Sequence, residues 1–216
     1  MTAPPLTETS FQEMTNVSRE TMARLQTYVR ELKRWNRTVN LVSALSLRDV
    51  WRRHILDCAQ LARLIPPTAK TLVDMGSGAG LPGLILAILL RETDPFRVVL
   101  VESHGRKCAF LTALAAKLAL PVDVVNGRLE QIPRFDADVI TARALAPLDR
   151  LLVHAARFAG PKTHCIFLKG QNVGMELTAA TEYWTMSVDL QPSLSDPLGR
   201  VVHIQEFHRA EQQTIF

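Results

Sequence analysis

The feature that most constrains the fold is residues 71–89, TLVDMGSGAGLPGLILAIL, in which an apolar strand runs through a glycine-rich turn into an apolar helix. The run of apolar residues at 71–75 is typical of a buried strand, and the helical pattern continues to residue 91. Turns of this build lie at the carboxyl edge of parallel sheets and hold nucleotide-like ligands there. The stretch therefore predicts a strand–turn–helix unit with a ligand site, whose ligand the turn alone does not name.

The segments that follow this unit alternate between strand and helix patterns, which predicts an α/β fold with a doubly wound, mostly parallel sheet. The predicted strands are seven in number and cover residues 71–75, 97–103, 122–125, 138–141, 164–168, 187–190 and 201–207. The predicted helices cover residues 80–91, 106–118, 147–158 and 174–184. The turn-rich residues 192–199 predict a closing hairpin that adds one antiparallel strand.

The chain before residue 68 has a different pattern. Residues 1–15 are polar and without periodicity, so we expect a flexible, loosely held arm there. From Ser18 onward apolar residues recur every three or four positions, which predicts a helix. A second helix is expected over residues 46–64, opened by a capping-box-like pair, Ser46 and Asp49. The expected organisation is an arm (1–15), a helical region (16–67) and a ligand-binding domain (68–216).

Positive charge is concentrated in the helical region. Residues 18–63 hold ten basic and four acidic side chains, a net charge of +6, whereas the whole chain carries +4. A polyanionic partner such as RNA explains this asymmetry, and so does a helix face kept soluble by arginine, so charge alone leaves both open. The candidate RNA-binding residues of this region are Arg34, Arg37, Arg52, Arg53 and His54.

The remaining composition indicates an intracellular setting. The three cysteines, Cys58, Cys108 and Cys165, are far apart in the sequence, which favours neither a disulfide framework nor a metal site. No signal-peptide pattern opens the chain and no apolar run is long enough to cross a bilayer. We expect a cytoplasmic protein without a metal and with no membrane partner.

The residues around the glycine turn select among nucleotide-like ligands. A phosphate-binding loop needs Lys and Ser or Thr after its last glycine, where Leu81 and Pro82 stand. A dinucleotide fingerprint needs the pattern G-x-G-x-x-G. The turn offers Gly76, Gly78 and Gly80, but a leucine stands where the third glycine of the fingerprint is required. Asp74 is expected to repel a pyrophosphate and to attract an ammonium or sulfonium group. With Glu102 ending the next strand, where an acid accepts ribose hydroxyls, the pattern favours S-adenosylmethionine and predicts a Rossmann-like methyltransferase domain.

Two methyl acceptors are disfavoured. Methylation of an exocyclic amine commonly uses an Asn/Asp-Pro-Pro-aromatic stretch after the fourth strand, where this chain has T-A-R-A at residues 141–144. Methylation at a pyrimidine carbon needs a cysteine nucleophile, and Cys165 lies inside an apparent buried strand.

The chain resembles the bacterial 16S rRNA guanine-N7 methyltransferases, the glucose-inhibited division protein B family. The segments that carry the resemblance are WNRTVNLVS (35–43), WRRHILD (51–57), VDMGSGAGLPGLILAI (73–88), VES (101–103), RKCAFL (106–111), GRLEQI (127–132), TARALAPL (141–148) and FLKG (167–170) with Glu176. Cys58 departs from the serine that we expect after the RHxxD pattern. The resemblance implies methyl transfer from S-adenosylmethionine, leaving S-adenosylhomocysteine, to N7 of a guanine in the decoding region. It also implies that the cofactor contacts are Gly76, Leu81, Leu129, Glu130 and Arg143, with Glu102 beside them.

An N7 acceptor explains why no catalytic base is evident. Guanine N7 carries a lone pair and no proton, so its attack requires positioning rather than deprotonation. Arg143, Lys169 and His54 are the candidates for substrate positioning. The expected partner is 16S rRNA, in the small subunit or an assembly intermediate, and nothing in the sequence demands more than a monomer. Two alternatives stay open: a methyltransferase for another substrate, and a ribosome-binding factor with a regulatory cofactor site.

Overall fold

A seven-stranded sheet forms the centre of the computed structural model, which describes residues 4–91 and 96–210. The strand order is β3-β2-β1-β4-β5-β7-β6, and β7 runs antiparallel to both of its neighbours. The sheet and its closing hairpin therefore confirm the predicted doubly wound, mostly parallel α/β fold. The strands are β1 (Thr71–Met75), β2 (Arg97–Glu102), β3 (Val122–Asn126), β4 (Ala137–Arg143), β5 (Ala159–Lys169), β6 (Trp184–Pro192) and β7 (Arg200–Arg209).

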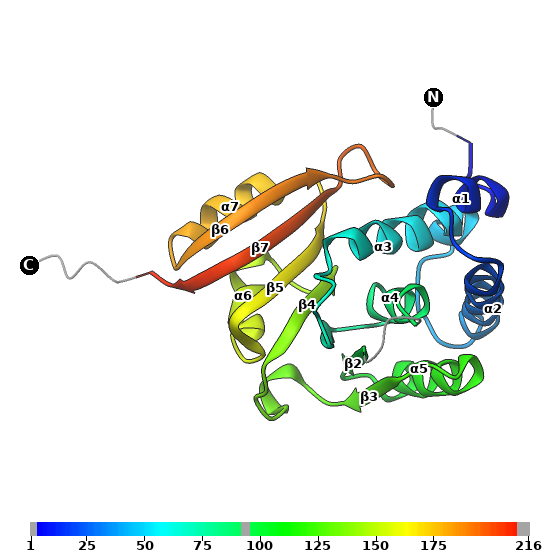
Figure 1. Ribbon diagram of the computed structural model, residues 1–216, viewed down its shortest axis with the longest axis horizontal. Coiled ribbons are helices and arrows are strands. Elements are labelled where there is room, and N and C mark those ends of the chain that lie inside the picture. The colour runs from blue at the N-terminus through cyan, green and yellow to red at the C-terminus, as the bar shows by residue number, and fades with distance from the viewer. Residues whose placement is uncertain (1–3, 92–95, 211–216) are drawn as a thin grey trace, which may run out of the picture.

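Helices cover both faces of the sheet because successive side chains of each buried strand point to opposite faces. In β1, Leu72 packs in the core on the face of α4 and α5, whereas Val73 packs in the core on the face of α6 and α7. Figure 1 shows α6 and α7 beside β5 to β7, with the other helices at the opposite side of the molecule. The helices of this domain are α4 (Gly83–Leu89), α5 (Gly105–Leu118), α6 (Leu148–Ala155) and α7 (Val173–Thr181), with a short turn of helix η4 (Leu129–Gln131).

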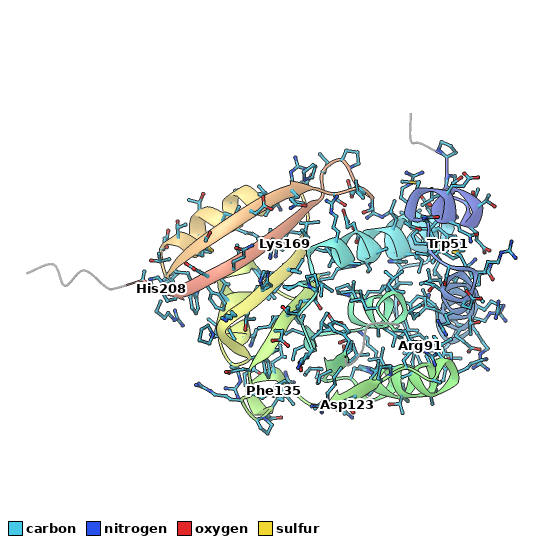
Figure 2. The ribbon with its side chains drawn as sticks, viewed as in Figure 1. Trp51, Arg91, Asp123, Phe135, Lys169 and His208 are labelled. Carbon is cyan, nitrogen blue, oxygen red and sulfur yellow. The ribbon has the colours of Figure 1, made fainter. Side chains whose placement is uncertain are left out.

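The N-terminal region packs on the α4 and α5 side of the sheet. Its first helices are α1 (Glu8–Thr15) and α2 (Arg19–Trp35). The periodicity from Ser18 onward predicted α2, and the structure shows Ser18 as its N-cap. The expected loose arm over residues 1–15 is wrong for residues 8–15, which form α1. Phe11 on α1 is fully buried, with its ring centroid 5.4 Å from that of Trp51, so an aromatic anchor helps to hold this polar segment. Figure 2 labels Trp51 on the helix that follows η1. Residues 1–3 lie outside the described part of the chain.

The second predicted helix is present as four consecutive segments: η1 (Ser46–Asp49), η2 (Trp51–Leu56), α3 (Asp57–Ala59) and η3 (Gln60–Leu64). Ser46 does not cap it, since it lies inside the first turn of η1 and its side chain makes no capping hydrogen bond there; its N–H donates to Ser43 Oγ at 3.2 Å. The Ser46 hydroxyl instead lies 2.9 Å from His54 Nε2. The helix therefore begins as predicted, but its expected capping residue serves a side-chain network further along. Within the described ranges, no helix is both long and apolar enough to cross a bilayer.

Candidate functional site

A cavity of ≈ 470 Å³ opens at the carboxyl ends of β1, β2 and β4, the edge at which doubly wound sheets bind ligands. Seven of the predicted cofactor contacts line it: Gly76, Gly78, Leu81, Glu102, Leu129, Glu130 and Arg143. The further side chains in its wall are Leu41, Val42, Ser77, Ala79, Val101, Ser103, Lys107, Arg128, Ala144, Leu145 and His154, with Gly127.

The glycine turn shapes one wall of this cavity through its backbone conformation. Gly76, Gly78 and Gly80 have φ values of +66°, +56° and +80°, a region that residues with a Cβ adopt only at a cost. A Cβ on Gly76 would lie 2.6 Å from Leu145 Cδ1, and one on Gly80 would lie 2.6 Å from Leu84 Cβ. Gly80 is absent from the cavity lining, so its role is to turn the chain into α4.

Asp74 lies behind the cavity and does not line it, contrary to the expectation that it contacts a cationic ligand. Its side chain is fully buried beneath the turn. Asp74 Oδ2 accepts the N–H of Gly83 at 3.1 Å, and Oδ1 accepts the hydroxyl of Thr141 at 2.8 Å. Burial raises the pKa of Asp74 to about 6, against the opposing effect of these hydrogen bonds. Asp74 thus joins the start of α4 to β4 and holds the glycine turn between them.

Glu102 occupies the place predicted for it, at the end of β2 in the cavity wall. Its Oε2 accepts the Gly78 N–H at 2.9 Å and its Oε1 accepts the His104 N–H at 2.8 Å. Each carboxylate oxygen has capacity for a further hydrogen bond. Glu102 therefore fixes the glycine turn and still presents acceptors to the cavity.

The N-terminal region forms part of the same cavity, a contribution that the sequence patterns did not reveal. Tyr28 on α2 is fully buried, and its hydroxyl donates to the carbonyl of Ala79 in the glycine turn at 2.8 Å. Asn36 Oδ1 accepts the N–H groups of Leu41 and Val42, both at 2.9 Å, so this loop folds back towards the cavity and lines it. The only indication of this contribution in the sequence was the segment WNRTVNLVS, which was part of the family resemblance.

Arg143 is fixed by the helix at residues 51–59. Its Nη1 donates to Asp57 Oδ2 at 2.8 Å and to the Arg53 carbonyl at 3.0 Å, and its Nη2 donates to His54 Nδ1 at 2.7 Å. Since a guanidinium only donates, His54 Nδ1 is an acceptor and its Nε2 carries the proton that points to Ser46. Burial, with Arg143 and Arg53 nearby, lowers the pKa of His54 to about 3.

His54 is therefore neutral, 2% exposed and turned away from solvent. This placement corrects the expectation that it faces RNA, because its helix position suggested a surface that Arg143 and Ser46 in fact occupy. Among the other RNA-binding candidates, Arg34 and Arg37 are exposed, and exposed Arg53 pairs with Asp196 at 2.7 Å. Arg52 pairs with Asp49 and donates to the Pro4 carbonyl, so it holds the N-terminal segment in place.

A second cavity of ≈ 390 Å³ adjoins the first, and Arg143 and Ala144 line both. Ala144 has a φ of +51°, so the shared wall includes a strained residue. Lys169 lies in this second cavity at the end of β5 nearest to α3 (Figure 2). The other lining residues are Arg53, Asp57, Leu168, Gly170, Glu176, Ser193, Ser195, Asp196, Gly199 and Arg200.

The loop between β6 and β7 forms the outer wall of the second cavity. Asp57 Oδ1 accepts the Ser195 hydroxyl, and Gln60 Oε1 accepts the Leu194 N–H at 2.8 Å. The loop is thus docked on the helix that also holds Arg143, and one network joins the two cavities. Over residues 4–91 and 96–210, no group of three or more His, Cys, Asp or Glu side chains is arranged to hold a metal ion, and all three cysteines are buried thiols.

The sheet order, the glycine turn and the acid at the end of β2 define a domain of the S-adenosylmethionine-dependent methyltransferase type. Solved structures with this fold include the following two. A SAM-dependent methyltransferase from Aquifex aeolicus aligns with a TM-score of 0.57 at 18% identity, covering 74% of this chain and 94% of that one. An O-methyltransferase from Bacillus cereus in complex with SAH aligns with a TM-score of 0.56 at 14% identity, covering 83% and 91%.

Sequence comparison gives the particular family. Residues 21–197 match the family described as rRNA small subunit methyltransferase G. Curated relatives named ribosomal RNA small subunit methyltransferase G include one from Rhodospirillum rubrum, 48% identical over 95% of this chain and 100% of its own. Another, from Parvibaculum lavamentivorans, is 47% identical over 94% of this chain and 91% of its own. The chain belongs to this family of methyltransferases, as the sequence motifs indicated.

Proposed function

We propose that the protein transfers a methyl group from S-adenosylmethionine to N7 of a guanine in the decoding region of 16S rRNA. The observation that carries the proposal is the pair of adjoining cavities that share Arg143 and Ala144, within a chain of the rRNA small subunit methyltransferase G family. Two substrates must meet at one point for group transfer, and two cavities with one common wall provide that arrangement.

The residues of the first cavity fit S-adenosylmethionine. The glycine turn has no Cβ at Gly76 or Gly78, which permits a ligand to approach its backbone closely. Glu102 offers acceptor capacity for ribose hydroxyls, and apolar Leu81 and Leu129 suit the faces of an adenine ring. Gly76, Gly78, Leu81, Glu102, Leu129, Glu130 and Arg143 would hold the cofactor, with Gly80 and Asp74 positioning the turn behind them. When bound, this cofactor supplies an electrophilic methyl group.

The contribution of the protein to the chemistry is positioning. Guanine N7 has no proton to remove, and alignment of two bound reactants lowers a barrier by about 7–11 kcal/mol. His54 is not available as a general base, because it is buried and its Nδ1 already accepts a hydrogen bond from Arg143. Its part in substrate positioning is indirect: it orients Arg143 in the wall that both cavities share. Lys169 lines the second cavity, from which it positions the methyl acceptor.

The rRNA partner is bound through the exposed arginines of the N-terminal region. Arg34, Arg37 and Arg53 offer guanidinium groups for phosphates, which give affinity without sequence preference. Arg53 lines the second cavity as well, so it connects the RNA surface with the acceptor site. We propose that the substrate is the small subunit or an assembly intermediate, and that the protein acts in the cytoplasm as a monomer without a metal.

The test mixes the purified protein with tritiated S-adenosylmethionine and small subunits from a strain that lacks the gene. We expect label in 16S rRNA at one guanine, where borohydride and aniline treatment then cleaves the chain selectively at N7-methylguanine. Label that resists this cleavage would refute N7 as the acceptor atom. Absence of label with intact subunits, subunit precursors and free rRNA would refute the rRNA substrate.

A further inference from the structure

Glu176 lines the second cavity, and one of its carboxylate oxygens has no hydrogen-bond partner among the described residues. Glu176 Oε2 accepts the Leu148 N–H at 2.9 Å and pairs with Lys169 Nζ at 2.5 Å. Within the described part of the chain, Oε1 has no hydrogen-bond partner. The two other carboxylates of this cavity are committed through both oxygens: Asp57 to Arg143 and Ser195, and Asp196 to Arg53 and the Leu198 N–H.

Lys169 provides a donor beside this free acceptor. Its ammonium group has three N–H bonds, of which one reaches the Ala146 carbonyl at 2.9 Å and one reaches Glu176. The side chain is only 9% exposed, so both contacts hold the ammonium group at a defined point of the cavity. The third N–H and Glu176 Oε1 therefore form a fixed pattern of one donor next to one acceptor.

We propose that the Lys169–Glu176 pair selects guanine in the second cavity, an inference that rests on the proposed function. Guanine presents the O6 acceptor next to the N1–H and N2–H donors, which is the complement of this pattern. O6 accepts from Lys169, and Glu176 Oε1 accepts from N1–H and N2–H. Adenine presents an amino donor at the position of O6 and a lone pair at N1, so it would face both charged groups with the wrong polarity.

The same arrangement directs N7 towards the cofactor cavity. O6 and N7 lie on one edge of the purine, so a base held through O6 and N1 leaves N7 free. Lys169 is bonded to Ala146, two residues beyond the wall residue Ala144 that both cavities share. The bound base thus lies along the loop that leads to the methyl donor.

The pairing of the two charges also suits the reaction. An unpaired ammonium group near O6 would oppose the positive charge that methylation places on the purine, and Glu176 neutralises it. Positive charge on the ring makes N1–H and N2–H stronger donors, so the hydrogen bonds to Glu176 strengthen as the methyl group is transferred. Such an interaction accelerates the reaction because it favours the transition state over the bound substrate.

The experiment crosses two changes, one in the protein and one in the RNA. Small subunits are reconstituted with guanosine or with inosine at the target position; inosine lacks only the N2 amino group. Wild-type protein and Glu176→Gln are each assayed for kcat and KM with both substrates. We expect inosine to lower kcat/KM of the wild type roughly 10-fold or more. We expect Glu176→Gln to lower kcat with guanosine by roughly 100-fold. The kcat of this variant should fall little further with inosine, because the acceptor for N2–H is already weakened.

Controls separate this role from a structural one. Glu182→Gln, at the exposed end of the same helix, should retain wild-type kcat. S-adenosylmethionine affinity of Glu176→Gln, measured by calorimetry, should stay within about threefold of wild type. Independent, multiplying losses from the inosine and Glu176→Gln changes would overturn the proposal, and so would equal rates of the wild type on the two substrates. These outcomes differ from failure of the proposed function, in which the wild type leaves the guanosine subunit unmethylated.

Discussion

Asp74 offers a direct test of how the cofactor turn is held. Replacement by alanine leaves the Gly83 N–H and the Thr141 hydroxyl without the acceptor they share. Each buried donor left unpaired costs about 1–3 kcal/mol, so Asp74→Ala should lower the free energy of unfolding by about 2–6 kcal/mol. Asn keeps the size of the side chain, retains a carbonyl for Gly83 and can donate to Thr141 Oγ1. Asp74→Asn should therefore cost less than about 1.5 kcal/mol.

The two variants distinguish positioning of the turn from direct attraction of a cationic cofactor. If Asp74 acts by holding the turn, Asp74→Asn should bind S-adenosylmethionine within about fivefold of wild type, while Asp74→Ala should lose at least about tenfold. Calorimetric titration gives the affinities, and urea unfolding gives the stabilities. Asp123→Asn, on exposed β3, is the matched control. A folded Asp74→Asn variant whose affinity falls as far as that of Asp74→Ala would refute the positioning role and restore the electrostatic one.

Three further results are expected. Because burial raises the pKa of Asp74 to about 6, the folded state binds its proton more tightly than the unfolded state does. Wild type should therefore lose up to about 3 kcal/mol of stability relative to Asp74→Asn as pH rises from 4 to 6, and parallel urea-unfolding profiles over that range would contradict this. Tyr28→Phe should cost about 1–3 kcal/mol in thermal unfolding and weaken cofactor binding, since the Ala79 carbonyl loses its donor; unchanged cofactor affinity would show that α2 does not hold the turn. Arg37→Gln should weaken binding to the small subunit and reduce the salt dependence of log Kd by about one unit, and an unaltered salt slope would remove Arg37 from the RNA surface.

The alternation of strands and helices in the sheet domain was predictable from local sequence patterns. Both faces are buried along the central strands β1, β2, β4 and β5, which therefore read as short apolar runs. The strand β7 was found because the turn-rich loop before it indicated a hairpin. α1 was missed because this polar segment is held by contacts with distant residues, namely the burial of Phe11 against Trp51 and the hydrogen bond from Gln26 to Glu8. Contacts of this kind between segments distant in sequence leave no periodicity to detect.

The site was predictable where a residue acts through its position on a strand. Glu102 ends β2 and lies in the cavity wall, as the order of elements implied. Asp74 and His54 differ because their roles depend on partners far along the chain: Thr141 for Asp74 and Arg143 for His54. Sequence identified both residues as important and misjudged the direction in which each side chain points. The sequence indicated Glu176 only through the family resemblance, because its role depends on the ion pair with Lys169.

The anchoring of Arg143 by Asp57 and His54 has a consequence for modularity. Many enzymes acquire a new substrate by fusing a recognition segment to an unchanged catalytic core. Here residues from the N-terminal helices complete the wall of the cofactor cavity, hold its glycine turn and orient its arginine. Residues 68–216 alone would lack these supports, so the N-terminal helices cannot be exchanged without rebuilding that cavity. The N-terminal helices and the cavity that they complete are therefore inherited as one unit.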